Sequence, residues 1–289
     1  MAARAGDASA YAPIAAALAY CAFAAPEASE GVYAVLRDGW LGNDSIPAIR
    51  AVAPAPLSPQ FWTTFWQLLD ETPAMDALTV TSRVAALGAL INPSLRGRAE
   101  AVAAHHPKAA QPAMRTPPPR LTIDELARQP EGSLGNDFWR LIIDNKFDLE
   151  VLDRETISLS SLPPALCYLN TRILQMHDVW HLAGGFHTTA LHEIAISAFQ
   201  LAQFGHGYSA MFLAVVTSRM ALSGSEAVPA VLQTIAEASQ YGADCPSFMA
   251  IPWEKEWHEP LRVIRARYGF TAFKGSFPPD LFEQSRSAA

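Results

Sequence analysis

The chain has 289 residues, of which 50% are hydrophobic and 17% are charged, with a net charge of -7 and a mean hydropathy of +0.10. It is long enough for one large domain or two small ones with a sizeable core, and its negative charge argues against a nucleic-acid-binding protein. Its three cysteines, Cys21, Cys167 and Cys245, are too few and too widely spaced for a disulfide framework or a CxxC zinc site. They favour a reducing compartment, so we expect a cytoplasmic protein.

The first apolar run along the chain, residues 10–28 (AYAPIAAALAYCAFAAPEA), resembles the core of a signal peptide. Asp7 before it and Pro13 within it argue instead for a buried helix. No other run reaches the roughly 18 to 20 apolar residues that span a membrane. We therefore expect that any contact with a membrane is peripheral, at its inner face.

A helix is predicted for the segment SPQFWTTFWQLLDE. Phe61, Phe65 and Leu68 recur at helical spacing and should form its buried face. Ser58 and Pro59 suit the N-cap and the first helical position.

The segment from His105 to Arg120 contains five prolines and few apolar residues. Such a composition is typical of a linker or of a strap over the surface. We place the main boundary here, which divides the chain into a divergent Ala- and Pro-rich helical region, residues 1–119, and a second helical region, residues 120–289.

The second region begins with a helix signal. Thr122 as N-cap and Glu125 three positions later form a capping box. Helical patterns continue to the end of the chain, and no stretch shows a convincing strand alternation. The sequence therefore predicts an all-α fold, a multi-helix globular bundle.

Two of these predicted helices form a hairpin. The first begins at the prolines of LPPALCYLNTRILQMHDVWHL and should end at Gly184-Gly185. The second is ALHEIAISAFQLAQF, for which Thr188 or Thr189 is the expected N-cap.

Histidines and carboxylates gather around this hairpin, in HDVWHLAGGFHTTALHE. With about 100° per helical residue, His177, Asp178 and His181 occupy one arc of about 100°, on the mostly apolar face. Burying them without partners would cost several kcal/mol. Glu193 on the next helix could swing back over His181, and the four together make a plausible set of ligands for a divalent metal.

The residues alone leave two other interpretations open. The cluster could be a buried hydrogen-bonded network without a metal. It could also be an ordinary water-facing surface, because Glu193, Ser197 and Gln200 recur at helical spacing and Asp178 could cap a turn.

Three ordered motifs make residues 120–273 similar to a known family. HDxxH, eleven residues and then Glu is the signature of the ubiquinone (coenzyme Q) biosynthesis protein four family, and the chain has His177, Asp178, His181 and Glu193 at that spacing. PEGSLGNDFWRLI and PWEKEWHEPLRVIRARYGF resemble further segments of that family, and an arginine corresponding to Arg172 is also typical of it.

The resemblance implies an all-helical fold with one divalent metal, usually zinc, held by His177, Asp178, His181 and Glu193, with iron or manganese as alternatives. It further implies a role in building the ubiquinone head group, by replacing the ring carboxyl at C1 of a prenylated hydroxybenzoate with hydroxyl. We therefore expect a metal-dependent decarboxylase or lyase without a further cofactor. The alternatives are a non-catalytic scaffold that binds a prenyl lipid, and a related enzyme acting on a different aromatic substrate.

The partners implied are a prenylated aromatic substrate or isoprenoid lipid and other quinone-biosynthesis enzymes. A homodimer is compatible with the sequence. Nearly uncharged residues 195–204 and 208–216 predict an apolar tunnel for a tail beside the metal. Arg172 and Arg219 are candidates for binding a carboxylate or pyrophosphate.

The chain also departs from the family. His187 and His192 stand where the family has Pro and Gly. Both are expected to face water at the start of a helix, and the alternative is that either one adds a proton relay or an outer-shell partner for the metal.

Overall fold

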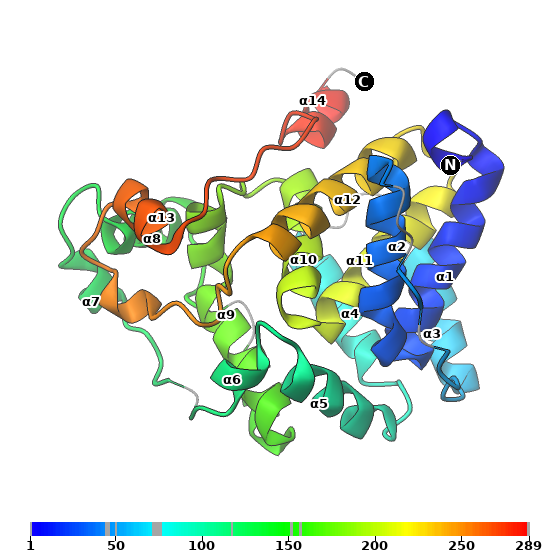
Figure 1. Cartoon of the computed structure of the whole chain (residues 1–289), viewed down its shortest axis with the longest axis horizontal. Helices are drawn as coiled ribbons and strands as arrows, with labels where there is room; N and C mark the ends of the chain where they lie inside the picture. Colours follow the sequence, from blue (N-terminus) through cyan, green and yellow to red (C-terminus); the bar gives the residue numbers. More distant parts are fainter. Residues whose placement is uncertain are drawn as a thin grey trace. The chain divides into compact units, whose positions relative to one another are not determined.

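A computed structural model describes residues 2–43, 47–49, 51–70, 77–116, 118–150, 153–155 and 158–287. These residues form α-helices, short 3-10 helices and loops, and no strand occurs among them, which confirms the predicted all-α fold (Figure 1). They divide into two compact units built from separate segments. The first unit comprises residues 1–102, 189–243 and 275–289, and the second comprises residues 103–188 and 244–274.

Both units combine segments from before and after residue 119. The expected division into residues 1–119 and 120–289 therefore stays a prediction about the sequence.

The first unit is organised around one apolar helix, α11 (Gly207–Leu222), against which α1, α3, α4 and α10 pack. Its helices are α1 (Tyr11–Ala24), α2 (Ser29–Leu41), α3 (Pro59–Asp70), α4 (Ala77–Gly88), most of α5 (Leu95–His105), α10 (Ala190–Phe204), α11, α12 (Val228–Asp244) and α14 (Leu281–Ser287). α1 and α2 lie beside the yellow α11 in Figure 1.

The apolar N-terminal run is the packed helix α1, as the sequence predicted. Leu18, Cys21 and Phe23 are almost fully buried, and α1 lies along α11. α2 also reaches α11, because the Tyr33 hydroxyl donates a hydrogen bond to the Ala210 carbonyl at 3.4 Å. α11 is therefore covered by the N-terminal helices as well as by α10, which accounts for much of its apolar character. None of the described helices is both long enough and apolar enough to span a bilayer.

The predicted helix α3 is confirmed, although Glu71 at its end lies outside the described residues. The Ser58 hydroxyl accepts a hydrogen bond from the Phe61 amide at 3.1 Å and caps the first turn. Phe61, Phe65 and Leu68 are buried, as expected. The ring of Phe61 lies 5.1 Å from that of Phe23 on α1, so aromatic contacts join the two helices.

The second unit surrounds one long helix, α9 (Pro164–Gly184), which contacts α6, α8 and α13. Its helices are α6 (Ala110–Ala113), α7 (Ile123–Ala127), α8 (Leu134–Asn145), α9 and α13 (Leu261–Tyr268), with short 3-10 helices at Leu159–Ser161 and Trp253–Lys255. The capping box of Thr122 and Glu125 is present at the start of α7, as predicted.

The proline-rich segment, of which residues 105–116 and 118–120 are described, contributes to the packed part of the second unit. It contains α6, which packs against α9, and it buries His106 and Ala109. Lys108 fastens it further by donating a hydrogen bond to the Cys245 carbonyl at 2.6 Å. Its small apolar residues fit against a neighbouring helix, a tertiary effect that its composition alone does not reveal.

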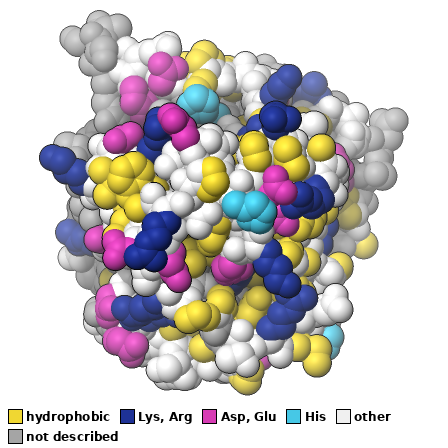
Figure 2. Space-filling view, turned by 90° about the vertical axis from the view of Figure 1, so that its left-hand side faces the viewer, with side chains coloured by type: hydrophobic (Ala, Val, Ile, Leu, Met, Phe, Trp, Pro, Cys, Tyr) yellow, Lys and Arg dark blue, Asp and Glu magenta, His cyan; other side chains and the backbone are white. Residues whose placement is uncertain are grey.

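Charged side chains of both signs are interspersed on the face drawn in Figure 2, with hydrophobic side chains between them. Within the second unit, Arg267 forms ion pairs with both Glu256 and Glu259. The pattern is that of an ordinary mixed surface. None of the three cysteines takes part in a disulfide, as their spacing suggested.

Candidate metal centre

The candidate site lies on the last two turns of α9. Pro163 and Pro164 start this helix, where proline is tolerated. Gly185 ends it as the C-cap, with φ of 76°, a left-handed conformation that suits glycine. The predicted helix end at Gly184-Gly185 is therefore confirmed, and it fixes the turn that follows the histidines.

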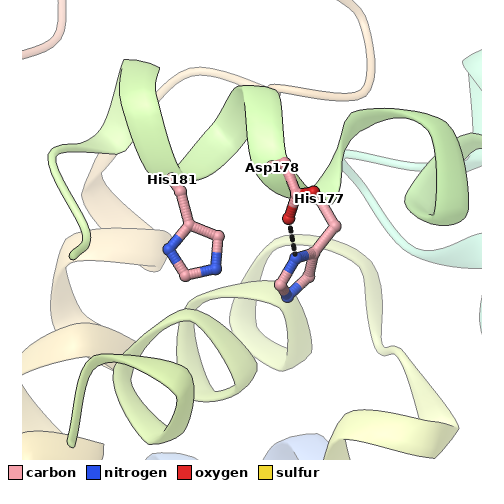
Figure 3. A group of neighbouring side chains, drawn as sticks. All are labelled: His177, Asp178 and His181. Atoms are coloured by element: carbon pink, nitrogen blue, oxygen red, sulfur yellow. Dashed lines mark hydrogen bonds and ion pairs between the residues drawn. The ribbon is translucent and has the colours of Figure 1, made fainter. Parts of the chain in front are cut away.

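The structure brings His177, Asp178 and His181 together. Each offers a ligand atom, and these atoms all lie within 4.8 Å of one another. The two imidazole ring centroids are 4.7 Å apart, as expected for residues one helical turn apart, and Figure 3 shows both rings on the same side of α9.

Asp178 holds one nitrogen of His177. Its Oδ1 lies 3.0 Å from His177 Nδ1, the contact drawn as a dashed line in Figure 3. If Nδ1 carries the proton and donates it to this carboxylate, Nε2 keeps its lone pair for a ligand. About a quarter of each side chain is exposed, 27% for His177 and 24% for Asp178. They therefore form the open part of the cluster.

His181 is the buried member, with only 2% of its surface exposed. Its Nδ1 lies 3.3 Å from the backbone carbonyl oxygen of Phe186. A proton on Nδ1 would face this oxygen and again leave Nε2 as the ligand atom. Histidines that bind metals usually have the other ring nitrogen held in this way by a carbonyl or a carboxylate.

The turn after His181 is tightly held. The Phe186 amide donates to the His181 carbonyl at 2.8 Å, and the Phe186 ring stacks on that of Phe273. The Arg265 guanidinium donates to the carbonyls of Ala183 and Leu182 at 3.0 and 2.9 Å, and thus satisfies the end of α9. Contacts from the C-terminal segment therefore fix the backbone around Phe186, whose carbonyl is the partner of the His181 ring.

These supporting groups were not predicted as part of the site. The Phe186 carbonyl carries no sequence signal, because any residue has one. Arg265 did carry a signal, since it belongs to PWEKEWHEPLRVIRARYGF, but the sequence does not show that this motif meets the end of α9.

The motifs on either side of the site contact each other within the second unit. The amides of Leu134 and Gly135 donate to the carbonyls of Glu259 and Trp257, both at 2.8 Å. The Trp257 ring stacks on that of Phe138. PEGSLGNDFWRLI and PWEKEWHEPLRVIRARYGF therefore form one supporting structure.

Arg172 forms a buried ion pair that the sequence did not reveal. Its guanidinium is buried and pairs with Glu254 in the C-terminal motif. This ion pair ties α9 to the C-terminal segment. Two of the Arg172 donor atoms, Nη1 and Nη2, are engaged by Glu254. The role of Arg172 in binding a carboxylate or pyrophosphate stays a prediction.

Glu193 lies on the first turn of α10, which belongs to the first unit. It is half-buried, and its carboxylate is close enough to Tyr208 to affect the pKa of the tyrosine hydroxyl. Burial raises the pKa of Tyr208 to about 12, a hydrogen bond to Thr81 opposes that rise, and the Glu193 carboxylate adds to it. The inclusion of Glu193 among the metal ligands stays a prediction.

The start of α10 differs in part from expectation. Thr189 is the N-cap residue, but its hydroxyl donates to the Pro279 carbonyl at 2.6 Å and does not cap the helix. Glu283 of α14 accepts from the Ala190 amide instead, at 3.0 Å. His187 is exposed as expected, whereas His192 is buried, with 6% exposed. The C-terminal helix supplies the cap, which local sequence could not show.

The donor set of the cluster fits a divalent metal. Two imidazole nitrogens and a carboxylate oxygen are ligands that zinc, iron and manganese accept. One imidazole is buried and both have a second partner that orients the ring. Three protein ligands also leave room for a fourth protein group, water or substrate.

Comparison with known proteins supports the resemblance. Residues 82–274 match the family model described as "Coenzyme Q (ubiquinone) biosynthesis protein Coq4". The human "Ubiquinone biosynthesis protein COQ4 homolog, mitochondrial" is 27% identical over 159 residues, which cover 53% of this chain and 56% of that protein. The protein "Ubiquinone biosynthesis protein COQ4, mitochondrial" of Coprinopsis cinerea is 26% identical over 161 residues, or 52% of each. The matched part therefore spans about half the length of these relatives.

A crystal structure of a Nostoc punctiforme protein shares the fold. It superposes with a TM-score of 0.54 at 24% sequence identity, and covers 72% of this chain and 96% of that one.

Proposed function

Because the chain belongs to the Coq4 family of coenzyme Q (ubiquinone) biosynthesis proteins, we propose that it acts in this biosynthesis as a metal-dependent enzyme at ring carbon C1. The substrate proposed is a prenylated hydroxybenzoate, whose C1 carboxyl leaves as CO₂ and is replaced by hydroxyl. The observation that supports this proposal is the cluster of His177, Asp178 and His181, whose ligand atoms lie within 4.8 Å of one another.

The roles of the cluster residues follow from their contacts. Asp178 orients the His177 ring through Nδ1, and the Phe186 carbonyl orients the His181 ring. Both rings are thus prepared to present Nε2 without further rearrangement, and such preorganisation lowers the cost of binding. When bound, a divalent cation would polarise the carboxylate or phenolate oxygen of the ring as a Lewis acid, and iron or manganese would add a redox centre that zinc lacks.

The partial exposure of His177 and Asp178 supports access to the cluster. Substrate or solvent can reach a group that is about a quarter exposed, whereas His181 at 2% is closed off. His181 would therefore be the ligand at the buried end of the site, and the substrate would approach on the side of His177 and Asp178.

The proposed surroundings of the enzyme are other quinone-biosynthesis proteins and a membrane that it touches peripherally. The tail tunnel proposed for residues 195–204 and 208–216 rests on their lack of charge. Many of these residues are buried, among them Ala195, Phe199 and Ala214, so the packing of α11 against α1 and α10 already uses much of this surface.

The proposal is tested with purified protein and a 4-hydroxybenzoate that carries an isoprenoid tail, incubated with O₂ and a reductant that supplies two electrons per turnover. Mass spectrometry should detect CO₂ and a product with one oxygen from O₂ at C1, the other oxygen leaving as water. EDTA should abolish turnover and added metal should restore it. Far-UV circular dichroism should stay helical throughout, because a large helical core does not depend on one metal, unlike a small zinc domain.

Two results would contradict the proposal. Metal-loaded protein that releases no CO₂ from tailed or tail-less substrate, but retains a co-purified prenyl lipid, would favour the non-catalytic scaffold. Turnover that persists unchanged after complete removal of metal would separate the chemistry from the cluster.

A further inference from the structure

An apolar cavity lies wholly within the first unit and shares no residue with the metal cluster. It has a volume of about 490 Å³ and lies between α1, α3, the loop at residues 54–57 and the end of α11. Its size falls within the range of roughly 300 to 1,000 Å³ typical of small-molecule sites. All of its lining residues except three on α11 precede residue 82, where the family match begins. The cavity is therefore built mainly by residues that precede the segment matched by the family model.

The hollow arises from the pairing of a small-residue face with an aromatic one. α1 turns alanines toward the cavity, among them Ala12, Ala16 and Ala19, whose side chains are too short to fill the space. α3 faces them with Phe61, Phe65 and two tryptophans. A core packed to normal density would place a large residue opposite such rings. The sequence of α1 leaves that volume open.

The walls of the cavity are almost entirely hydrocarbon. None of the lining residues that the structure describes carries a charge, and Ser218 provides the only aliphatic hydroxyl among them. The other hydroxyl, that of Tyr20, already donates a hydrogen bond to the Val52 carbonyl at 3.3 Å. A charged ligand group would therefore find no partner inside, because burying an unpaired charge is costly.

Large apolar side chains at the cavity remain open to water. Tyr20, Trp62 and Trp66 are 46%, 45% and 49% exposed, and Leu222 is 58% exposed. All four line the cavity. Tyr and Trp combine an apolar ring with a polar edge and suit the mouth of a site where an apolar chain meets water.

From these observations we infer that this cavity binds the hydrocarbon chain of a single amphiphilic molecule, with its polar head left in solvent at the aromatic mouth. Uncharged walls favour the chain and exclude the head group. Isoprenoid and straight acyl chains share this chemistry, and their relative affinities distinguish the two sources. The cavity lies in the first unit and the metal cluster in the second. The binding inference is therefore tested independently of the proposed enzyme activity.

The inference is tested by isothermal titration calorimetry of the full chain with monomeric alcohols: straight chains of increasing length, and geraniol and farnesol for the isoprenoid class. Each added CH₂ that enters the cavity should strengthen binding about fourfold until the cavity is full. The heat capacity change should be negative, the signature of apolar burial. Tighter binding of farnesol than of a straight-chain alcohol of equal carbon number would identify the ligand class as isoprenoid. Tighter binding of the straight-chain alcohol would identify it as acyl.

Two neighbouring alanines of α1 provide matched variants. Ala16 lines the cavity and Ala17 does not, and both are exposed. Ala16→Phe should fill the cavity and weaken binding at least tenfold, whereas Ala17→Phe should bind like the wild type. If Ala16→Phe does not fold, Leu222→Asp tests the same site, because it places a carboxylate on an exposed lining position and should also weaken binding.

Three outcomes would overturn the inference. They are an affinity that does not depend on chain length, equal binding by the variants at residues 16 and 17, and binding to phosphatidylcholine vesicles without any binding of monomeric alcohols. The last result would show that the exposed tryptophans contact a membrane surface and that the cavity does not bind a single ligand molecule.

Discussion

Wild-type protein purified without chelators is expected to carry about one divalent metal ion per chain, and His181→Ala is expected to carry almost none. His181 is the buried ligand of the cluster and its ring is held by the Phe186 carbonyl. Changes to residues that only support a ligand already weaken metal binding by about 10- to 100-fold, so loss of the ligand itself should weaken it by more. Elemental analysis of the purified proteins measures the occupancy.

His187→Ala is the matched control, because His187 follows six residues later, is exposed and is not part of the cluster. It should keep the metal content of the wild type. A wild type that is free of metal, or His181→Ala with full occupancy, would contradict the site. Equal loss in both histidine variants would point to a general effect on stability.

Gly185→Ala is expected to cause the largest loss of stability of any single methyl addition near the site. Gly185 has φ of 76°, where a side chain is strained. A Cβ there would also lie 2.6 Å from the Cβ of Ala272, well inside van der Waals contact. Strain of about 1 to 2 kcal/mol and overpacking of about 1 to 3 kcal/mol together predict a loss of about 2 to 5 kcal/mol, to be measured by denaturant unfolding.

Gly132→Ala separates the two causes. Gly132 lies in the same unit and has nearly the same φ, 75°, but a Cβ there would meet nothing within 4 Å. It should show the backbone strain alone and lose about 1 to 2 kcal/mol. Equal losses in the two variants would show that the contact with Ala272 is not tight, and that the turn after His181 tolerates movement.

Local patterns predicted those parts of the structure that depend on neighbouring residues in the chain. Ser58 caps α3, the capping box starts α7, and Gly185 ends α9 because each involves atoms within a few residues. The cluster on α9 was predictable for the same reason, since helical spacing alone places His177 and His181 one turn apart.

Features that depend on distant segments were not predictable. Thr188 or Thr189 was expected to cap α10, but the hydrogen bond to the Ala190 amide comes from Glu283, 93 residues after Ala190. The ion pair of Arg172 with Glu254, 82 residues away in sequence, was not foreseen either. The cavity of the first unit likewise needs α1 and α3 to be placed side by side, which no single-helix pattern specifies.

X-ray absorption spectroscopy at the edge of the metal bound in the purified protein tests most directly whether this cluster holds it. Ligation by His177, Asp178 and His181 predicts nearest neighbours that are nitrogen and oxygen, at about 2.0 to 2.2 Å for zinc, with outer-shell scattering from two imidazole rings. Loss of imidazole scattering in His181→Ala should accompany the loss of metal. A sulfur neighbour at about 2.3 Å, from any of the three cysteines, or a spectrum without imidazole scattering would contradict the site.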